Sequence, residues 1–179
     1  MIDRDPLFPF PDYRGLEVTV QDCWRTRERR KEQDAVRSLL RKMNIRYMGN
    51  DRNHENTDFC GSTLYREQPA KNSTLAPRHY VEQARGKFTA HTLEEQTAIM
   101  QDYCRRYQTD TVVCYCHYCL EGLLQGNKDG RHIADLLFKS DNRWESKTPQ
   151  QATGHQTCSA AELRGIDPRG RSALRFGRC

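Results

Sequence analysis

The sequence predicts a small α/β fold with a parallel sheet and flanking helices, an irregular N-terminal arm and a C-terminal tail. Two observations predict it. Short apolar runs alternate with longer helical patterns between residues 16 and 138, in the order β-α-β-α-α-β-α-α. Cysteines also follow each expected strand. Because parallel strands end at one edge of a sheet, we expect the cysteines to meet at the carboxyl ends of the strands.

The length of 179 residues suits one domain with a hydrophobic core and is short for two complete domains. Residues 1–15 are rich in proline and predict an extended arm on the domain surface. Residues 16–139 form the expected single cysteine-rich domain. Residues 140–179 have no hydrophobic periodicity and are rich in Gln, Thr, Gly and Arg, so a disordered or loosely attached tail is expected there.

The first half of the domain is predicted to be a strand, a helix and a second strand. Residues 16–20 alternate apolar and polar side chains, as in a strand. Apolar side chains recur at helical spacing between 26 and 44, which predicts a crossover helix. A short strand over 45–48 and a polar loop over 49–58 then lead to Cys60.

The second half is predicted to contain two helices, a third strand and two more helices. Thr92 and Glu95 have the spacing of a capping box, which starts the clearest of these helices. The expected segments are a loop at 68–74, a helix at 77–85, a helix at 92–108, a strand at 111–115, a helix at 116–124, a turn at 126–130 and a helix at 132–138.

Charge and composition argue against several classes of function. The net charge is +5, but the densest basic run, 25–31, contains Glu28 and is flanked by one aromatic residue, so a solvated helix face is expected in place of a nucleic-acid surface. The N-terminus carries charges where a signal peptide would be apolar, and no apolar run has the length of a membrane span. These features predict a cytoplasmic protein, in which cysteines more often bind metals or exchange electrons than form disulfides.

Four cysteines are the candidate ligands of a metal or iron–sulfur cluster. Cys116 and Cys119 are expected in the first turn of a helix, whose N–H groups and dipole favour thiolates. Cys23 and Cys60 approach from other strand ends, so four thiolates can converge. Gly61 would let the backbone pass close to the bound group. Inert thiols, or a metal-free dithiol redox pair, remain as alternatives.

The other cysteines and the histidines are weaker candidates. Cys104 lies on the stripe of an expected helix and is expected to be a small buried hydrophobe, and Cys158 and Cys179 have no neighbouring cysteine at ligand spacing. His117 is expected to point away from the ligands on either side of it. The sequence has no phosphate-binding loop, nucleophile elbow or paired zinc histidines, which argues against hydrolases and nucleotide-binding proteins.

The three cysteine motifs together resemble a known family. Asp22-Cys23, Phe59-Cys60-Gly61 and Cys116-His117-Tyr118-Cys119 are similar, between residues 16 and 138, to the cysteine-rich CCG domain of heterodisulfide reductase and of the iron–sulfur subunits of glycolate oxidase and anaerobic glycerol-3-phosphate dehydrogenase. Two features depart from the family pattern: Phe59 stands where the family has the first cysteine of Cys-Cys-Gly, and the gap from Gly61 to Cys116 is longer.

The resemblance implies that Cys23, Cys60, Cys116 and Cys119 bind a 4Fe-4S cluster. The missing thiol at position 59 puts the family's noncubane, five-cysteine cluster in question, unless Cys114 supplies a replacement sulfur; a four-thiolate cubane or a zinc site is the other expectation. The implied function is electron transfer within an oxidoreductase like heterodisulfide reductase, with a redox partner subunit or carrier. The alternatives are a zinc-stapled binding module and a metal-free dithiol redox protein.

Overall fold

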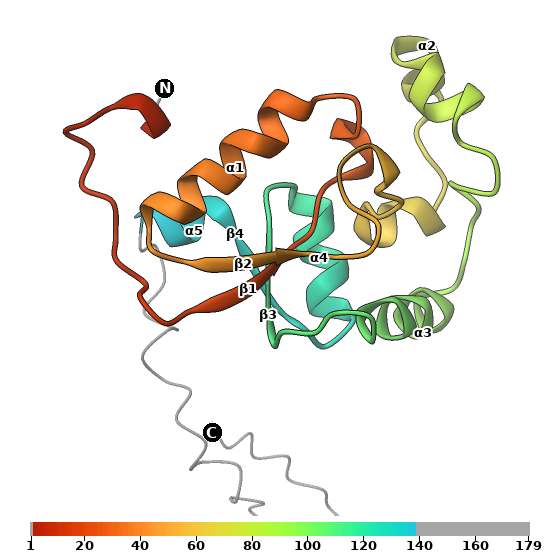
Figure 1. Cartoon of the computed structure of the whole chain (residues 1–179). Helices are drawn as coiled ribbons and strands as arrows, with labels where there is room; N and C mark the ends of the chain where they lie inside the picture. Colours follow the sequence, from red (N-terminus) through yellow and green to blue (C-terminus); the bar gives the residue numbers. More distant parts are fainter. Residues whose placement is uncertain (1, 139–179) are drawn as a thin grey trace, which may run out of the picture. The chain divides into compact units, whose positions relative to one another are not determined.

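The computed structural model describes residues 2–138 of the chain (Figure 1). Four strands form one sheet in the order β2-β1-β3-β4, and every neighbouring pair is parallel. The strands are β1 (Glu17–Val20), β2 (Arg46–Gly49), β3 (Thr111–Cys114) and β4 (Asp129–His132). The predicted small α/β fold with a parallel sheet is therefore confirmed. The expected tail at 140–179, with Cys158 and Cys179, lies outside the described residues.

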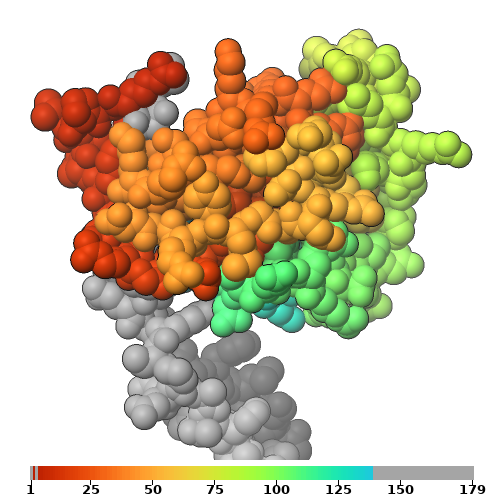
Figure 2. Space-filling model, viewed as in Figure 1, coloured from red at the N-terminus to blue at the C-terminus, as the bar shows by residue number. Residues whose placement is uncertain are grey.

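Helices flank the sheet and fill the connections between its strands. The α-helices are α1 (Arg30–Lys42), α2 (Ala70–Leu75), α3 (Leu93–Cys104), α4 (His117–Gln125) and α5 (Ile133–Phe138). Shorter turns are the 3₁₀ segments η1 (Ile2–Arg4), η2 (Trp24–Thr26), η3 (His54–Asn56) and η4 (Gly61–Tyr65), and the π-helical turn η5 (Arg78–Glu82). Figure 2 shows the face of the molecule that α1 and β2 cover.

The hydrophobic core has two parts, one on each face of the sheet. On one face, side chains of β1 pack with those of α1 and α5, including Val18 and Leu40. On the other face, side chains of α3, α4 and η4 pack together, including Met100 and Leu123. The central strand β3 contributes to both parts because its side chains alternate between the faces, and all four of its residues are buried.

The chain path places a topological switch point between β1 and β3. After β1 the chain passes through α1 to β2 on one side, and after β3 it passes through α4 to β4 on the other side. In open parallel sheets, functional sites form beyond the carboxyl ends of the two strands at such a point. Cys23 follows β1 and Cys116 follows β3, so this position is where two of the candidate ligands lie.

The helix predicted from the capping box is α3, and its cap is present as expected. The Glu95 N–H donates to Thr92 Oγ1 at 3.2 Å, and the Thr92 N–H donates to Glu95 Oε2 at 2.8 Å. These two bonds satisfy backbone donors that the first turn leaves without helical partners. The helix ends at Cys104, four residues before the predicted end at 108.

The structure corrects the sequence prediction at three places. Strand β4 lies where a turn and the start of a helix were expected, and it is an edge strand of polar sequence, so it has no alternation to mark it. Helix α2 overlaps the expected loop at 68–74; none of its residues is buried, so an apolar stripe is missing there. The helix expected at 77–85 is reduced to the π-helical turn η5.

The N-terminal arm runs along the face that α1 and α5 cover. It starts with the short η1 turn and continues without regular structure. The Tyr13 N–H donates to the Met43 carbonyl, and the Tyr13 hydroxyl donates to the Leu136 carbonyl, each at 2.9 Å. Phe8 and Phe10 pack against the core below.

Candidate metal centre

Cys23 lies in the turn after β1, and a buried polar network fixes this turn. The fully buried Asp22 carboxylate accepts two hydrogen bonds from the Arg37 guanidinium, at 3.0 and 2.7 Å, and one from the His54 N–H at 2.9 Å. The Tyr115 hydroxyl bonds Asp22 at 3.1 Å and accepts the Cys23 N–H at 3.2 Å. The network thus ties the turn to α1, to η3 and to the end of β3.

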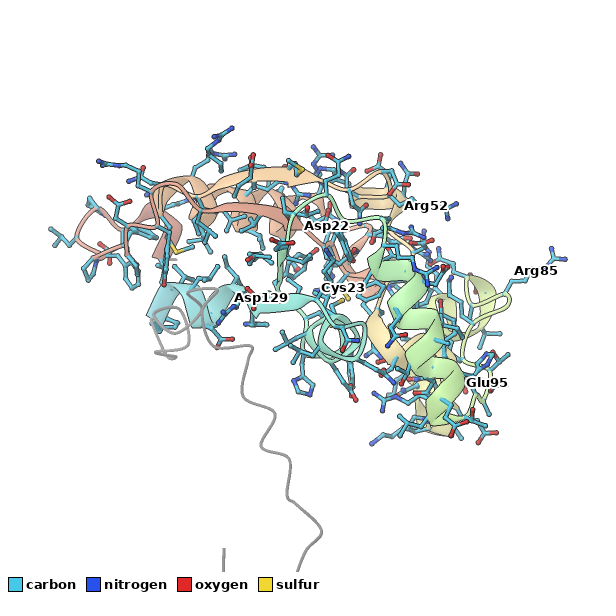
Figure 3. The ribbon with its side chains drawn as sticks, turned by 90° about the horizontal axis from the view of Figure 1, so that it is seen from below. Asp22, Cys23, Arg52, Arg85, Glu95 and Asp129 are labelled. Carbon is cyan, nitrogen blue, oxygen red and sulfur yellow. The ribbon has the colours of Figure 1, made fainter. Side chains whose placement is uncertain are left out.

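The ionisation of Asp22 reflects these partners. Burial alone raises the pKa of the Asp22 carboxyl, but the bonds from Arg37, the His54 N–H and Tyr115 outweigh it and hold this pKa below its usual value. Asp22 is therefore an anion paired with Arg37 inside the protein. In Figure 3, Asp22 and Cys23 lie next to each other within the molecule, whereas Arg85 extends away from it.

Cys60 is brought next to Cys23 by contacts of the residues around both. The Trp24 N–H donates to the Phe59 carbonyl at 2.8 Å, which joins the two cysteine segments directly. The Phe59 ring stacks on Tyr103 of α3 with ring centroids 4.4 Å apart. Phe59 is thus a buried aromatic anchor, 1% exposed, directly before Cys60.

Cys116 and Cys119 lie at the start of α4, and two glycines let this helix reach the Cys60 segment. Gly61 has a φ of +58°, and a Cβ on it would lie 1.7 Å from the Tyr118 carbonyl oxygen. A Cβ on Gly122 would lie 2.4 Å from the Gly61 Cα. The space beside Gly61 is therefore filled by the backbone of α4, whereas the sequence had suggested that a bound group would fill it.

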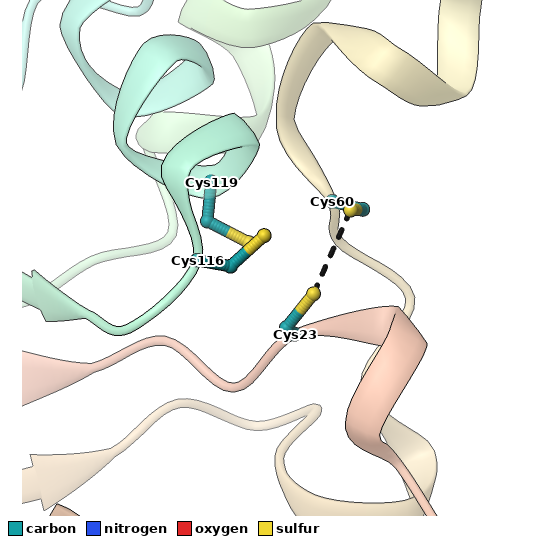
Figure 4. A group of neighbouring side chains, drawn as sticks. All are labelled: Cys23, Cys60, Cys116 and Cys119. Carbon is teal, nitrogen blue, oxygen red and sulfur yellow. Dashed lines mark hydrogen bonds between the residues drawn. The ribbon is translucent and has the colours of Figure 1, made fainter.

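Figure 4 shows the four cysteine side chains converging from these three segments. The sulfur atoms of Cys23, Cys60, Cys116 and Cys119 all lie within 4.8 Å of one another. The Cys23 and Cys60 sulfurs are 3.6 Å apart. Cys23, Cys60 and Cys119 are at most 1% exposed, and Cys116 is partly exposed. The four predicted ligands are thus together in one site that can hold a metal.

The cysteines of the group differ in pKa, so they do not ionise equally. Hydrogen bonds from the Cys119, Cys23 and Cys60 thiols lower the pKa of Cys116 far below its usual value. Bonding to the Cys116 sulfur raises the pKa of Cys60, and burial followed by the same bonding raises that of Cys119. The group therefore favours a thiolate at Cys116. A bound cation would draw the remaining protons off, since thiolates are the metal-binding form.

The sulfur spacing fits a single tetrahedral ion. Zinc–thiolate bonds of about 2.3 Å place the sulfurs of a tetrahedral site about 3.8 Å apart. The distance between the Cys23 and Cys60 sulfurs is 3.6 Å, and all four sulfurs lie within 4.8 Å of one another, which is compatible with that value. Soft thiolate ligands select zinc, copper(I) or iron over magnesium and calcium. A cubane cluster would hold the four sulfurs farther apart, because each binds a different iron.

The structure excludes Cys114 from this group. Cys114 is fully buried at the end of β3, and its thiol faces the Cys116 carbonyl at 3.8 Å. On an alternating strand, Cys114 and Cys116 would face the same side. Both cysteines do contact the same part of the core, but the strand ends at Cys114 and only Cys116 belongs to the sulfur group.

The remaining candidates lie where the sequence predicts. Cys104 is buried in the core beside Met100 and Tyr103 and is not part of the group. His117 is exposed, and its ring packs beside Tyr118, outside the sulfur group. None of the six described cysteines forms a disulfide.

Sequence reasoning missed Arg25, which had been assigned to a solvated helix face. Arg25 precedes α1 and is half-buried, with its guanidinium over the rings of Tyr80 at 5.3 Å and Tyr118 at 5.0 Å. The one feature of the sequence that could have indicated a role for Arg25 is its position two residues after the candidate ligand Cys23.

Four buried polar atoms without a hydrogen-bond partner also lie on residues that closely follow Cys23 or Cys60: Trp24 Nε1, Arg25 Nε, Ser62 Oγ and Thr63 Oγ1.

Comparisons with protein-family models, with curated proteins and with solved structures found no match for this chain. Among the described residues, no helix combines the length and the apolar character that crossing a membrane requires.

Proposed function

We propose that this protein binds a single metal ion through Cys23, Cys60, Cys116 and Cys119, and that zinc is the ion the site fits best. The observation that carries the proposal is the spacing of the four sulfurs, all within 4.8 Å of one another. A bound cation would offset the charge of four thiolates, which otherwise repel one another and whose charge burial opposes.

Four protein ligands leave no open coordination position, which is the pattern of structural zinc sites and differs from that of hydrolytic ones. The ligands come from the turn after β1, from the segment before η4 and from the start of α4. A metal held by all three would fix them to one another. The proposed role is thus a zinc-stapled module whose loops beyond the sheet edge are held for contact with a partner.

The test is metal analysis of the protein purified without oxygen, together with acid-labile sulfide and an ultraviolet–visible spectrum. We expect about one zinc per chain with no sulfide and no visible absorption. Protein that contains no metal and cannot be loaded with zinc would overturn the proposal and leave a dithiol redox role.

A second candidate is an iron–sulfur centre for electron transfer. The unpartnered donors Trp24 Nε1, Arg25 Nε, Ser62 Oγ and Thr63 Oγ1 favour it, because inorganic sulfides are acceptors that a zinc ion does not provide. The resemblance to the CCG domain supports it as well. When bound, a cluster would supply one-electron chemistry, and the partly exposed Cys116 marks the side nearest a redox partner.

This candidate has its own signature in the same experiment. Iron and sulfide in comparable amounts, with a broad visible band bleached by dithionite, would establish it and replace zinc. The chain would then serve as a subunit of an oxidoreductase resembling heterodisulfide reductase, because its sequence carries no flavin or nicotinamide motif and must receive electrons from a partner.

A further inference from the structure

We infer that Arg25 is the positioning residue that compensates the negative charge of the cysteine centre. The inference rests on the proposed metal site, and it concerns a side chain that binds no metal itself. It starts from an unusual combination for an arginine: a half-buried guanidinium that forms no ion pair with any carboxylate among residues 2–138.

Two aromatic rings hold Arg25 in place. Its guanidinium lies 5.3 Å from the centre of the Tyr80 ring and 5.0 Å from that of the Tyr118 ring. Tyr118 lies between the ligands Cys116 and Cys119 in the chain, and the Arg25 carbonyl bonds His79 at 3.1 Å. Arg25 is thus fixed from both sides, with one contact made by the turn that carries two of the four sulfurs.

Because no carboxylate among the described residues pairs with Arg25, the cysteine sulfurs are the negative groups that can balance its positive charge. Its Nε is buried without a hydrogen-bond partner, which is costly unless an acceptor is supplied. Cys60 and Cys23 lie within electrostatic range of the Arg25 guanidinium. A tetrathiolate centre with a divalent ion carries a net charge of −2, so one adjacent guanidinium offsets half of it.

A neighbouring arginine provides a matched control. Arg27 also packs on an aromatic ring, with its guanidinium 4.5 Å from the centre of the Trp24 ring, and it donates a hydrogen bond to the neutral side chain of Gln83. The cysteines do not contribute to its electrostatic surroundings, which are set by burial, Glu28 and Arg78. Substitution at Arg27 therefore removes the same charge and a similar stacking contact without touching the centre.

The experiment is a chelator competition with cobalt(II), whose thiolate charge-transfer bands report both occupancy and ligand number. We expect Arg25→Gln to weaken cobalt binding about tenfold or more, the loss that one charge-assisted contact supplies. Arg25→Lys should recover part of the affinity because it keeps the charge, and Arg27→Gln should bind like the unmodified protein. The bands should keep the intensity of four thiolates in every variant.

Equal cobalt affinity in Arg25→Gln and Arg27→Gln would overturn the role of Arg25 while leaving the metal site intact. A failure of the unmodified protein to bind cobalt would overturn the proposed function itself, and the two results are distinct. Thermal unfolding of the metal-free proteins tests whether Arg25 acts through packing alone. A packing role predicts that Arg25→Gln loses as much unfolding free energy, relative to Arg27→Gln, as it loses in cobalt-binding free energy. It also predicts that Arg25→Lys recovers none of the affinity, and these two results together would show that Arg25 is structural.

Discussion

Cys116 differs from the other three cysteines of the centre in both exposure and charge. It is the member of the group that is partly exposed, and hydrogen bonds from the Cys119, Cys23 and Cys60 thiols lower its pKa. A low pKa combined with access to solvent makes a thiol the most reactive of its group. We therefore expect metal ions and oxidants to reach the group at Cys116 first, before the three buried sulfurs.

At the scale of the single ligand, we predict that Cys119→Ser abolishes stable metal binding whereas Cys114→Ser does not. Both thiols are fully buried, so the substitutions carry similar packing costs, but Cys119 alone belongs to the sulfur group. Metal content after gel filtration is the measurement, with a fall of more than tenfold expected for Cys119→Ser. Loss of metal in Cys114→Ser as well would show that Cys114 takes part in binding.

The buried pair of Asp22 and Arg37 gives a second prediction. Asp22→Asn keeps the shape of the side chain but leaves the Arg37 guanidinium buried without its counter-ion, so unfolding free energy should fall by about 3–5 kcal/mol. The control is Asp34→Asn, which removes an exposed pair with Arg30 and should change stability little. Urea unfolding of the metal-free proteins measures both. Similar effects of the two substitutions would contradict the prediction.

The same pair predicts the direction of one pH effect. The pKa of Asp22 is lower in the folded protein than in the unfolded chain, where it is about 3.9. Its contribution is therefore complete above that value and is lost as the pH falls through the lower, folded value. Metal-free protein should lose stability below about pH 4 more steeply than Asp22→Asn does. Parallel stability curves for the two proteins would argue against this linkage.

At the scale of elements, the centre depends on how closely α4 approaches η4. We predict that Gly61→Ala destabilises the protein by about 2–4 kcal/mol, because a methyl group would strike the Tyr118 carbonyl and because the φ of +58° disfavours any side chain. Gly86→Ala is the matched control: φ is +71°, and nothing lies within 4 Å of the added Cβ. The difference between the two unfolding free energies isolates the close contact, and equal losses would show that backbone strain alone is responsible.

The sequence was a good guide to elements with a strong local signal and a poor one elsewhere. The alternation at 16–20, the helical periodicity before Asn44 and the capping box at Thr92 each predicted an element that is present. Strand β4 carries no such signal, because pairing with β3 alone makes it a strand. Helix α2 has no buried face from which to be recognised.

The candidate site shows the same limit. Motif spacing was enough to select the four cysteines that the structure brings within 4.8 Å of one another. It could not exclude Cys114, whose thiol faces the Cys116 carbonyl and is not part of the group. It also could not find Arg25, because the rings of Tyr80 and Tyr118 that hold it come from distant parts of the chain. Tertiary contacts of this kind leave no pattern in one sequence.

For the whole molecule, metal binding should add directly to stability, since the ligands come from three separate segments. At a free metal concentration about 1,000 times the dissociation constant, the expected gain is about 4 kcal/mol. A chelator should therefore lower the thermal midpoint, and hydrogen exchange should lose protection first around Cys60 and at the start of α4. Unchanged exchange in these two segments would contradict a stapling role.

The order of the segments around the switch point between β1 and β3 also determines the stage of folding at which the four cysteines can come together. Cys23 and Cys60 precede β3 in the chain, whereas Cys116 and Cys119 follow it, so the first half of the chain carries two of the four thiols. The four sulfurs meet only after β3 has paired with β1 across a long chain separation, and such non-local pairing is slow. During synthesis, we therefore expect tight metal binding only after the start of α4, with Cys116 and Cys119, has emerged.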